Sequence, residues 1–167
     1  MGSIFLTLFF AIFLTIGVGI LGYGVHSYRL SQAAGSWPTA DGVITHSDLE
    51  IDSDSDGTTY RVKLNYQYSA LGVDRTGDNI AFGYAGSSAR NYHEILEDAL
   101  PVGTRVAVRY DPANPERSTL SFGVHKSILF ILLFGATWTM FTVGMAIMFL
   151  MGDGGPTVIL RNLQTYS

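Results

Sequence analysis

The chain has 167 residues, of which 47% are hydrophobic and only 14% charged, against about 25% charged in ordinary soluble domains. Its net charge of −4, with both signs interspersed, supplies neither the basic patch of a nucleic-acid surface nor a polybasic stripe for anionic lipid. It contains no cysteine, which excludes disulfides, thiolate nucleophiles and thiolate metal sites.

Two long uncharged runs lie near the ends of the chain, Ile4 to Tyr23 and Ile128 to Met151. At about 1.5 Å per residue, each is long enough to cross a bilayer core of about 30 Å as a helix. The first run is predicted to be a retained helix rather than a cleaved signal peptide, because it lacks a basic n-region and an A-x-A site. Trp138 falls in the middle of the second run, so we expect it to be a packing contact.

The polar region between these runs begins with Trp37-Pro38 and an Asp41-Gly42 turn. The pattern predicts a first strand over 43–51 and a second over 59–68. In the second strand, polar residues alternate with an apolar set, which is typical of a half-buried antiparallel strand. The apolar set is Tyr60, Val62, Leu64, Tyr66 and Tyr68.

Further along, "RTGDNIAFG" (75–83) predicts a third strand and 89–100 a helix capped by Ser87 or Ser88. The expected buried face of this helix comprises Tyr92, Ile95, Leu96 and Ala99. A strand follows over 104–110, then a turn at "DPANPERS", whose prolines give its residues a structural reason to be there. A short edge strand is expected at "TLSFG" (119–123).

The predicted fold class is therefore a membrane protein of α+β type, in which two transmembrane helices flank a small antiparallel domain of about five strands and one helix. The predicted divisions are a transmembrane helix over 1–27, a β-rich polar domain over 28–125, a second transmembrane helix over 126–152 and a C-terminal tail over 153–167.

The order "SWPTADGVI", "YRVKLNYQY", "GDNIAFG" and "LPVGTRVAVRYDPANPERSTL", between two apolar runs, resembles a large, mainly bacterial family of membrane proteins. That family is known as a domain of unknown function, DUF3592. The resemblance covers nearly the whole chain and implies the fold and the membrane placement. It implies no activity.

The stretch "DSDSDG" matches the first half of a calcium loop, with Asp52, Asp54 and Asp56 as candidate metal ligands. The position that should supply a bidentate Glu is Lys63, and strands rather than helices flank the loop. The favoured interpretation is the tip of a β-hairpin whose acids oppose edge-to-edge association. Weak cation binding is the alternative.

No other motif indicates catalysis. "FGYAGSSA" has neither phosphate-binding spacing nor a lysine, and no nucleophile elbow occurs. The four histidines are His26, His46, His93 and His125, and they form no zinc-binding spacing. His26 and His125 lie at the membrane ends of the two predicted helices, where a shared zinc or proton role is conceivable. We expect no catalytic residues, no cofactor and no enzymatic activity.

Small residues in the apolar runs are candidates for close helix packing, either within the chain or onto another membrane protein. These are Gly17, Gly19, Gly22 and Gly24 in the first run, and Gly135, Thr139, Thr142 and Ala146 in the second.

The expected function is that of a non-enzymatic interaction or assembly factor, with the lipid bilayer and another membrane protein, or a second copy, as partners and no nucleic acid. The alternative is a small-ligand or cation sensor, or an enzyme, with a pocket between sheet and helix. By resemblance the location is the bacterial inner membrane. The positive-inside rule taken alone favours a cytoplasmic domain, but the length of the domain exempts it from that rule. Together with the resemblance, this exemption favours the extracytoplasmic side.

Overall fold

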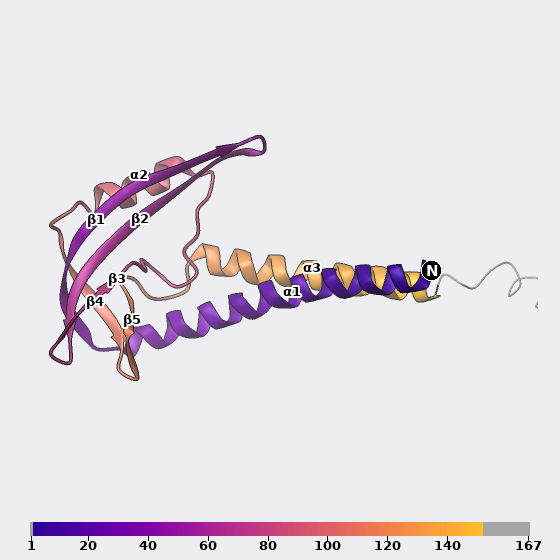
Figure 1. Ribbon diagram of the computed structural model, residues 1–167, viewed down its shortest axis with the longest axis horizontal. Helices are drawn as coiled ribbons and strands as arrows, with labels where there is room; N and C mark the ends of the chain where they lie inside the picture. Colours follow the sequence, from indigo (N-terminus) through magenta and orange to yellow (C-terminus); the bar gives the residue numbers. More distant parts are fainter. Residues whose placement is uncertain (1, 152–167) are drawn as a thin grey trace, which may run out of the picture. The chain divides into compact units, whose positions relative to one another are not determined.

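The computed structural model describes residues 2–151, which belong to two compact units; the predicted tail over 153–167 lies outside this range. One unit contains the chain up to Tyr23 together with the chain from Ile131 onward, and the other contains Gly24–Phe130. The elements are α1 (Gly2–Ala33), the 3-10 helix η1 (Ala34–Ser36), β1 (Thr39–Asp54), β2 (Gly57–Ala70), β3 (Val73–Gly77), α2 (Arg90–Asp98), β4 (Arg105–Asp111), β5 (Asn114–Thr119) and α3 (Lys126–Met151) (Figure 1).

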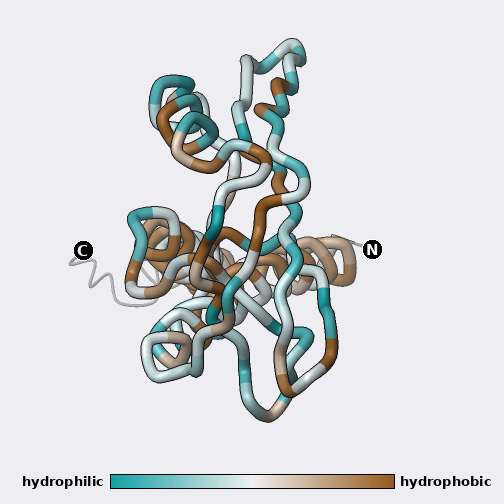
Figure 2. The backbone as a smooth tube through the Cα atoms, turned by 90° about the vertical axis from the view of Figure 1, so that its left-hand side faces the viewer, coloured by the Kyte–Doolittle hydropathy of each residue, from teal (hydrophilic) through white to brown (hydrophobic). Residues whose placement is uncertain are grey.

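The first unit is a pair of helices, the N-terminal part of α1 and most of α3. Both helices are long and apolar enough to cross a membrane, and Figure 2 colours them predominantly hydrophobic. The predicted role of Trp138 as a packing contact is confirmed. Its indole Nε1 donates to the carbonyl oxygen of Phe13 at 2.9 Å, and its ring stacks on that of Phe13 at 5.5 Å. This bond gives a polar group in an apolar setting the partner it needs.

The second unit is built on a five-stranded antiparallel sheet in the order β3-β2-β1-β4-β5, which confirms the predicted α+β class. The alternation predicted for β2 is also confirmed. The alternate residues of β2 from Val62 to Ala70, Tyr66 among them, pack in the core with Ile44, Ile80 and Val108, and Tyr60 is half-buried. Polar residues occupy the opposite face of β2, and the alternation of brown and teal along the strands follows this pattern (Figure 2).

A β-bulge between Ile44 and His46 explains why β1 shows a less regular pattern than β2. The register passes from Ile44 opposite Tyr66 to His46 opposite Asn65, so Thr45 is the extra residue. One extra residue reverses the alternation of faces. The bulge therefore keeps both Ile44 and Leu49 on the core side although they are five positions apart.

The sheet curls until the chain that follows β3 meets the end of β5. The amide of Ser121 donates to the carbonyl of Ile80 at 2.8 Å, and that of Leu120 to the carbonyl of Asn79 at 3.3 Å. Tyr66 lies at this junction, where its hydroxyl donates to the carbonyl of Asn79 at 3.1 Å and bonds to Ser118 Oγ at 3.0 Å. One fully buried tyrosine thus ties the two ends of the sheet together.

Four sequence-based expectations about the later elements were wrong. The third strand ends at Gly77 rather than extending to residue 83, because the following segment bonds to the end of β5 instead of β2. The last strand is β5, Asn114–Thr119, so the turn at "DPANPERS" is tighter than expected and most of that stretch is strand. Pro115 is tolerated in β5 because an edge strand needs fewer backbone donors.

The third error concerns the buried face of α2. Tyr92 and Ile95 are 56% and 61% exposed, whereas His93 is fully buried and Leu96 packs on the core. The expected serine cap is absent as well, since the N-cap residue is Ala89 and no side chain caps it. Hydropathy predicted that Tyr92 and Ile95 would be buried. The helix buries His93 instead, because hydrogen-bond partners for its ring lie within reach.

Candidate functional site

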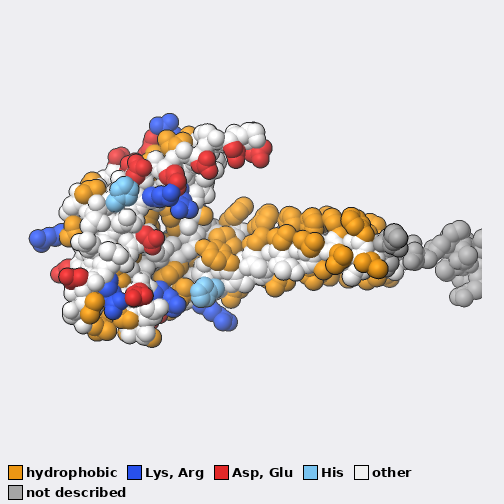
Figure 3. Space-filling view, viewed as in Figure 1, with side chains coloured by type: hydrophobic (Ala, Val, Ile, Leu, Met, Phe, Trp, Pro, Cys, Tyr) orange, Lys and Arg blue, Asp and Glu red, His pale blue; other side chains and the backbone are white. Residues whose placement is uncertain are grey.

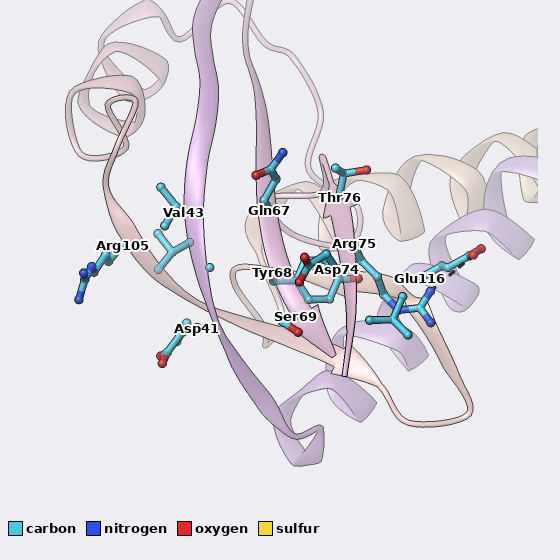
Figure 4. Close-up of a pocket in the computed structure, with 14 residues that line it drawn as sticks. Asp41, Val43, Gln67, Tyr68, Ser69, Asp74, Arg75, Thr76, Arg105 and Glu116 are labelled. Carbon is cyan, nitrogen blue, oxygen red and sulfur yellow. Dashed lines mark ion pairs between the residues drawn. The ribbon is translucent and has the colours of Figure 1, made fainter. Parts of the chain in front are cut away.

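The face of the sheet opposite the core is open and carries two rows of side chains. The register places Arg105 beside Val43, Val43 beside Gln67, and Gln67 beside Thr76, so one row crosses four strands. The neighbouring row contains Ala107, Asp41, Ser69 and Asp74. We call these eight residues the open face. They line a broad groove of about 1340 Å³ (Figure 4).

The charged side chains of the open face are unpaired. Asp41, Asp74 and Arg105 are exposed, and their side chains form no ion pair or hydrogen bond with any residue in the range 2–151. At the rim, by contrast, Arg75 Nη1 pairs with Glu116 Oε1 at 3.5 Å (Figure 4). Small-molecule sites are usually enclosed and mainly apolar. An open groove with unpaired charges of both signs is better suited to contact with the surface of another protein.

A second polar cluster lies beneath α2 and centres on His93, which is fully buried. Its Nδ1 lies 2.8 Å from the Tyr84 hydroxyl and its Nε2 2.9 Å from Ser87 Oγ. The Tyr84 oxygen also accepts the amide N–H of Val62 at 2.9 Å. The cluster therefore connects α2, the loop before it and β2 through hydrogen bonds.

Burial determines the protonation of this cluster. Desolvation lowers the pKa of His93 and raises that of the Tyr84 hydroxyl, so both groups are neutral near pH 7. A neutral imidazole donates from one nitrogen and accepts at the other, which matches its two hydroxyl neighbours. The sequence analysis missed this role because the partners are 9 and 6 residues away from His93 and form no zinc-binding spacing.

Arg109 is a second residue that the sequence analysis missed. Its Nη1 donates to the carbonyl oxygens of Ala34, Gly35 and Trp37 at 3.1–3.3 Å. Its guanidinium also lies 4.2 Å from the ring centroid of Phe122. The carbonyls at a helix C-terminus lack intrahelical partners and attract a cation. Arg109 thus fastens η1, which directly follows α1, to the sheet within the second unit.

The candidate metal ligands lie at the tip of the β1–β2 hairpin, as the favoured interpretation predicts. Asp54 Oδ1 accepts the amide N–H groups of Asp56 at 2.9 Å and Gly57 at 3.1 Å, so one of its oxygens is engaged by the turn itself. Asp52 lies opposite Thr59 in the ladder. Within residues 2–151, no three His, Asp or Glu side chains are placed to share a metal ion.

The remaining histidines are not brought together in the described part of the chain. His26 and His46 are exposed, and His125 is half-buried at the start of α3, where its Nε2 has no hydrogen-bond partner. No hydrogen bond or ring contact joins His26 to His125 in this range. The structure offers no geometry for the conceivable shared zinc or proton role.

Two of the predicted packing glycines lie directly at the contact between the helices of the first unit. A Cβ added to Gly17 would lie 2.7 Å from Thr139 Oγ1, and one added to Gly135 would lie 2.9 Å from the backbone nitrogen of Leu21. The two threonines bond within their own helix, Thr139 to the carbonyl of Gly135 and Thr142 to that of Trp138.

The other predicted packing residues do not share that contact. A Cβ added to Gly19 or Gly22 would meet no atom within 4 Å. Gly24 is buried but belongs to the second unit, and Ala146 is half-buried.

We expect Gly135→Leu to separate the two helices, because its side chain would collide with backbone rather than with a movable side chain. Overpacking costs about 1–3 kcal/mol, which would lower the population of paired helices at least about fivefold. Oxidative cross-linking between cysteines introduced at Phe10 and Phe149, whose rings lie 5.7 Å apart, measures this population without interference from native cysteines. Gly144→Leu is the matched control, since nothing lies within 4 Å of its Cβ. Equal yields for both variants would contradict the glycine contact.

The fold defines a class of protein, in which a small antiparallel sheet with one packed helix is flanked by two helices long and apolar enough to cross a membrane. The family described as Domain of unknown function (DUF3592) matches residues 40–125, which is more than half of the chain. The chain belongs to this family. No curated protein and no solved structure matches it.

Proposed function

We propose that this chain is a two-span integral membrane protein that acts, without catalysing a reaction, as an interaction or assembly factor. In this proposal its β-rich unit binds another membrane protein or a second copy of the chain through the open face. The observation that carries the proposal is the set of unpaired charges there, Asp41, Asp74 and Arg105. Unpaired charges on an accessible face favour complementary partners and suppress wrong ones.

The proposed location is the bacterial inner membrane, with the β-rich unit outside the cytoplasm. Both helices satisfy the length and hydropathy of a span. The segment between them is too long for the positive-inside rule to apply, so Arg29, Arg117 and Lys126 do not oblige it to remain in the cytoplasm. A reporter that is active only in the cytoplasm can be inserted in the 52–58 hairpin. Activity of this reporter would contradict the proposed orientation.

The alternative of a ligand pocket between sheet and helix receives less support. Beneath α2, Leu96 and Leu100 pack against the core, and the polar atoms of His93 are engaged by Tyr84 and Ser87. To bind a ligand, these groups would have to break the hydrogen bonds that they form with one another. Each group that the ligand then left unsatisfied would cost about 1–3 kcal/mol.

The open face can be tested by photo-crosslinking in cells that produce the full chain. We expect a photoreactive amino acid at Gln67, in the centre of the open face, to give a discrete adduct. A photoreactive residue at Glu97 on α2 is the control and should give none. The triple variant Asp41→Lys, Asp74→Lys and Arg105→Glu reverses the three free charges and should abolish the adduct at Gln67. If the adduct is absent, or survives the charge reversal unchanged, the proposed interaction surface is wrong.

A further inference from the structure

Strands β1 and β2 extend beyond the rest of the sheet as a two-stranded arm. β4 pairs with β1 only from Thr39 to Val43, and two further backbone bonds join Ile44 to Gly103 and Thr104. From residue 47 to 54, no strand in the described part of the chain pairs with β1 on the side away from β2. We call this stretch the arm edge. Figure 1 shows the arm continuing past the other strands to its tip.

The direction of the backbone groups on the arm edge follows from the ladder. Tyr60 exchanges both of its backbone bonds with Ser87, at 2.8 and 3.0 Å, on the side away from β1. Its partner in β1 is Ile51, so this pair is one of the non-hydrogen-bonded pairs of the antiparallel ladder. The N–H and C=O groups of Ile51 therefore point outward. The same holds two residues away in either direction, at Leu49 and Ser53.

Outward backbone groups of this kind form a template for another strand. On the β2 side of the arm the corresponding groups are occupied, Tyr60 by Ser87 and the amide of Val62 by the Tyr84 hydroxyl. Over the described residues, the β1 side carries no such cover. An extended segment that is added there would gain main-chain bonds at three successive outward positions.

The charges of the arm determine which segment is suited to this edge. Glu50 is engaged by Lys63 at 2.5 Å and by Arg61 at 3.9 Å. Asp48 and Asp52 form no ion pair with any described residue, and the acids of the tip lie beyond them (Figure 3). A second copy would place acid against acid across the new ladder, which is destabilising. A segment with Lys or Arg opposite these acids is favoured instead.

The outward residues themselves supply the second element of recognition. Their side chains are on the other face of the arm, where Ile51 is 53% exposed. Because successive side chains of a strand alternate between faces, a partner strand would present basic residues on the acidic face and apolar residues beside Ile51.

We propose that the arm edge is a strand-addition site for an extended segment of a partner protein in which Lys or Arg alternates with apolar residues. This site is separate from the open face and extends the proposed function to a second contact of defined chemistry. The backbone of the partner supplies the ladder bonds, and its alternating side chains supply the selectivity.

Fluorescence anisotropy of the full chain in detergent micelles, at low salt, tests the proposal. The probe is a short labelled peptide in which Lys alternates with Val, and the controls are the same peptide with Glu in place of Lys and a version N-methylated along one edge. We expect the Lys peptide to bind at least about tenfold more tightly than either control, because it alone has both the charge and the backbone donors. Equal binding of the N-methylated peptide would reduce the effect to charge attraction and overturn strand addition.

Two variants of the chain separate the contribution of charge from that of backbone hydrogen bonding. The double variant Asp48→Lys with Asp52→Lys should weaken binding of the Lys peptide about tenfold or more and strengthen binding of the Glu peptide. Ile51→Pro removes an outward N–H while leaving the bonds between β1 and β2 in place, so it should also weaken binding although the charges are unchanged. Far-ultraviolet circular dichroism checks that both variants are folded, and Asp48→Asn with Asp52→Asn should weaken the Lys peptide in the same direction but by less. Wild-type affinity in the Ile51→Pro variant would overturn the proposal.

Failure here is distinguishable from failure of the proposed function. Reversal of Asp41 and Asp74 on the open face should leave the peptide affinity unchanged, and the arm variants should leave the adduct at Gln67 unchanged. Loss of peptide binding in the open-face variant would place the peptide on the open face and overturn the arm-edge site.

Discussion

Replacing Tyr66 by Ala is expected to lower the free energy of unfolding of the β-rich unit by about 4 kcal/mol. The side chain is fully buried, and its removal loses both the apolar contacts and the volume that filled the core. It also leaves Ser118 Oγ and the carbonyl of Asn79 without the hydroxyl that joins them. Because these groups connect the two ends of the curled sheet, the whole unit should lose stability together.

Tyr66→Phe is the matched control, since it keeps the ring and removes only the hydroxyl. Its cost should be about 1–2 kcal/mol, the usual effect of a buried hydrogen bond lost with its partners left in place. Denaturant unfolding of the full chain in detergent, followed by Trp37 fluorescence in a Trp138→Phe background, reports on this unit because Trp37 packs edge-on against Phe82 at 5.7 Å. If the Ala variant were no less stable than the Phe variant, the junction would not depend on the ring.

Replacing His93 by Ala is expected to cost about 3 kcal/mol at pH 8, through the loss of a buried ring and of its bonds to Tyr84 and Ser87. The cost should depend on pH. The pKa of His93 is lowered in the folded state, so between that pKa and the unfolded value near 6.5 the unfolded chain binds more protons. The stability that the neutral imidazole supplies is therefore complete above pH 6.5 and decreases as the pH falls below it.

The same Trp37 assay, repeated between pH 8 and pH 5, measures this linkage as the difference between the wild type and His93→Ala. The difference in unfolding free energy should shrink toward acidic pH, by about 1.4 kcal/mol for each unit of pKa depression. Use of the difference cancels every pH-dependent contribution that the two proteins share. A constant or growing difference would show that His93 is not the buried neutral group described above.

Helix α2 shows why the candidate sites were less accessible to sequence analysis than the fold. Its amphipathic character was evident, but the register of its buried face was predicted on hydropathy, which favours Tyr92 and Ile95 over a histidine. The histidine is buried because Tyr84 and Ser87, from a loop with no recognisable motif, satisfy both ring nitrogens. A satisfied polar group costs little to bury, and whether it is satisfied depends on residues distant in the chain.

The open face and the arm edge illustrate the same limit from the side of the sheet. The alternation in β2 indicates that one face is wet, but the row through Gln67 and Val43 on that face is completed by Arg105 of β4, which is far along the chain. The β1–β2 hairpin was predictable, whereas the length over which β4 leaves β1 unpaired was not. That length depends on where Pro101 to Thr104 redirects the chain and on the bulge at Thr45.

Local patterns were sufficient to establish the two apolar helices, the α+β class, the faces of β2 and the hairpin tip, because each depends on periodicity or turn chemistry within a few residues. Long-range packing decided the burial of His93, the hydrogen bonds of Arg109 to η1 and Trp37, the junction at Tyr66 and the free edge of β1. Each of these depends on which segments the tertiary structure brings together or leaves apart, and no local periodicity encodes that outcome.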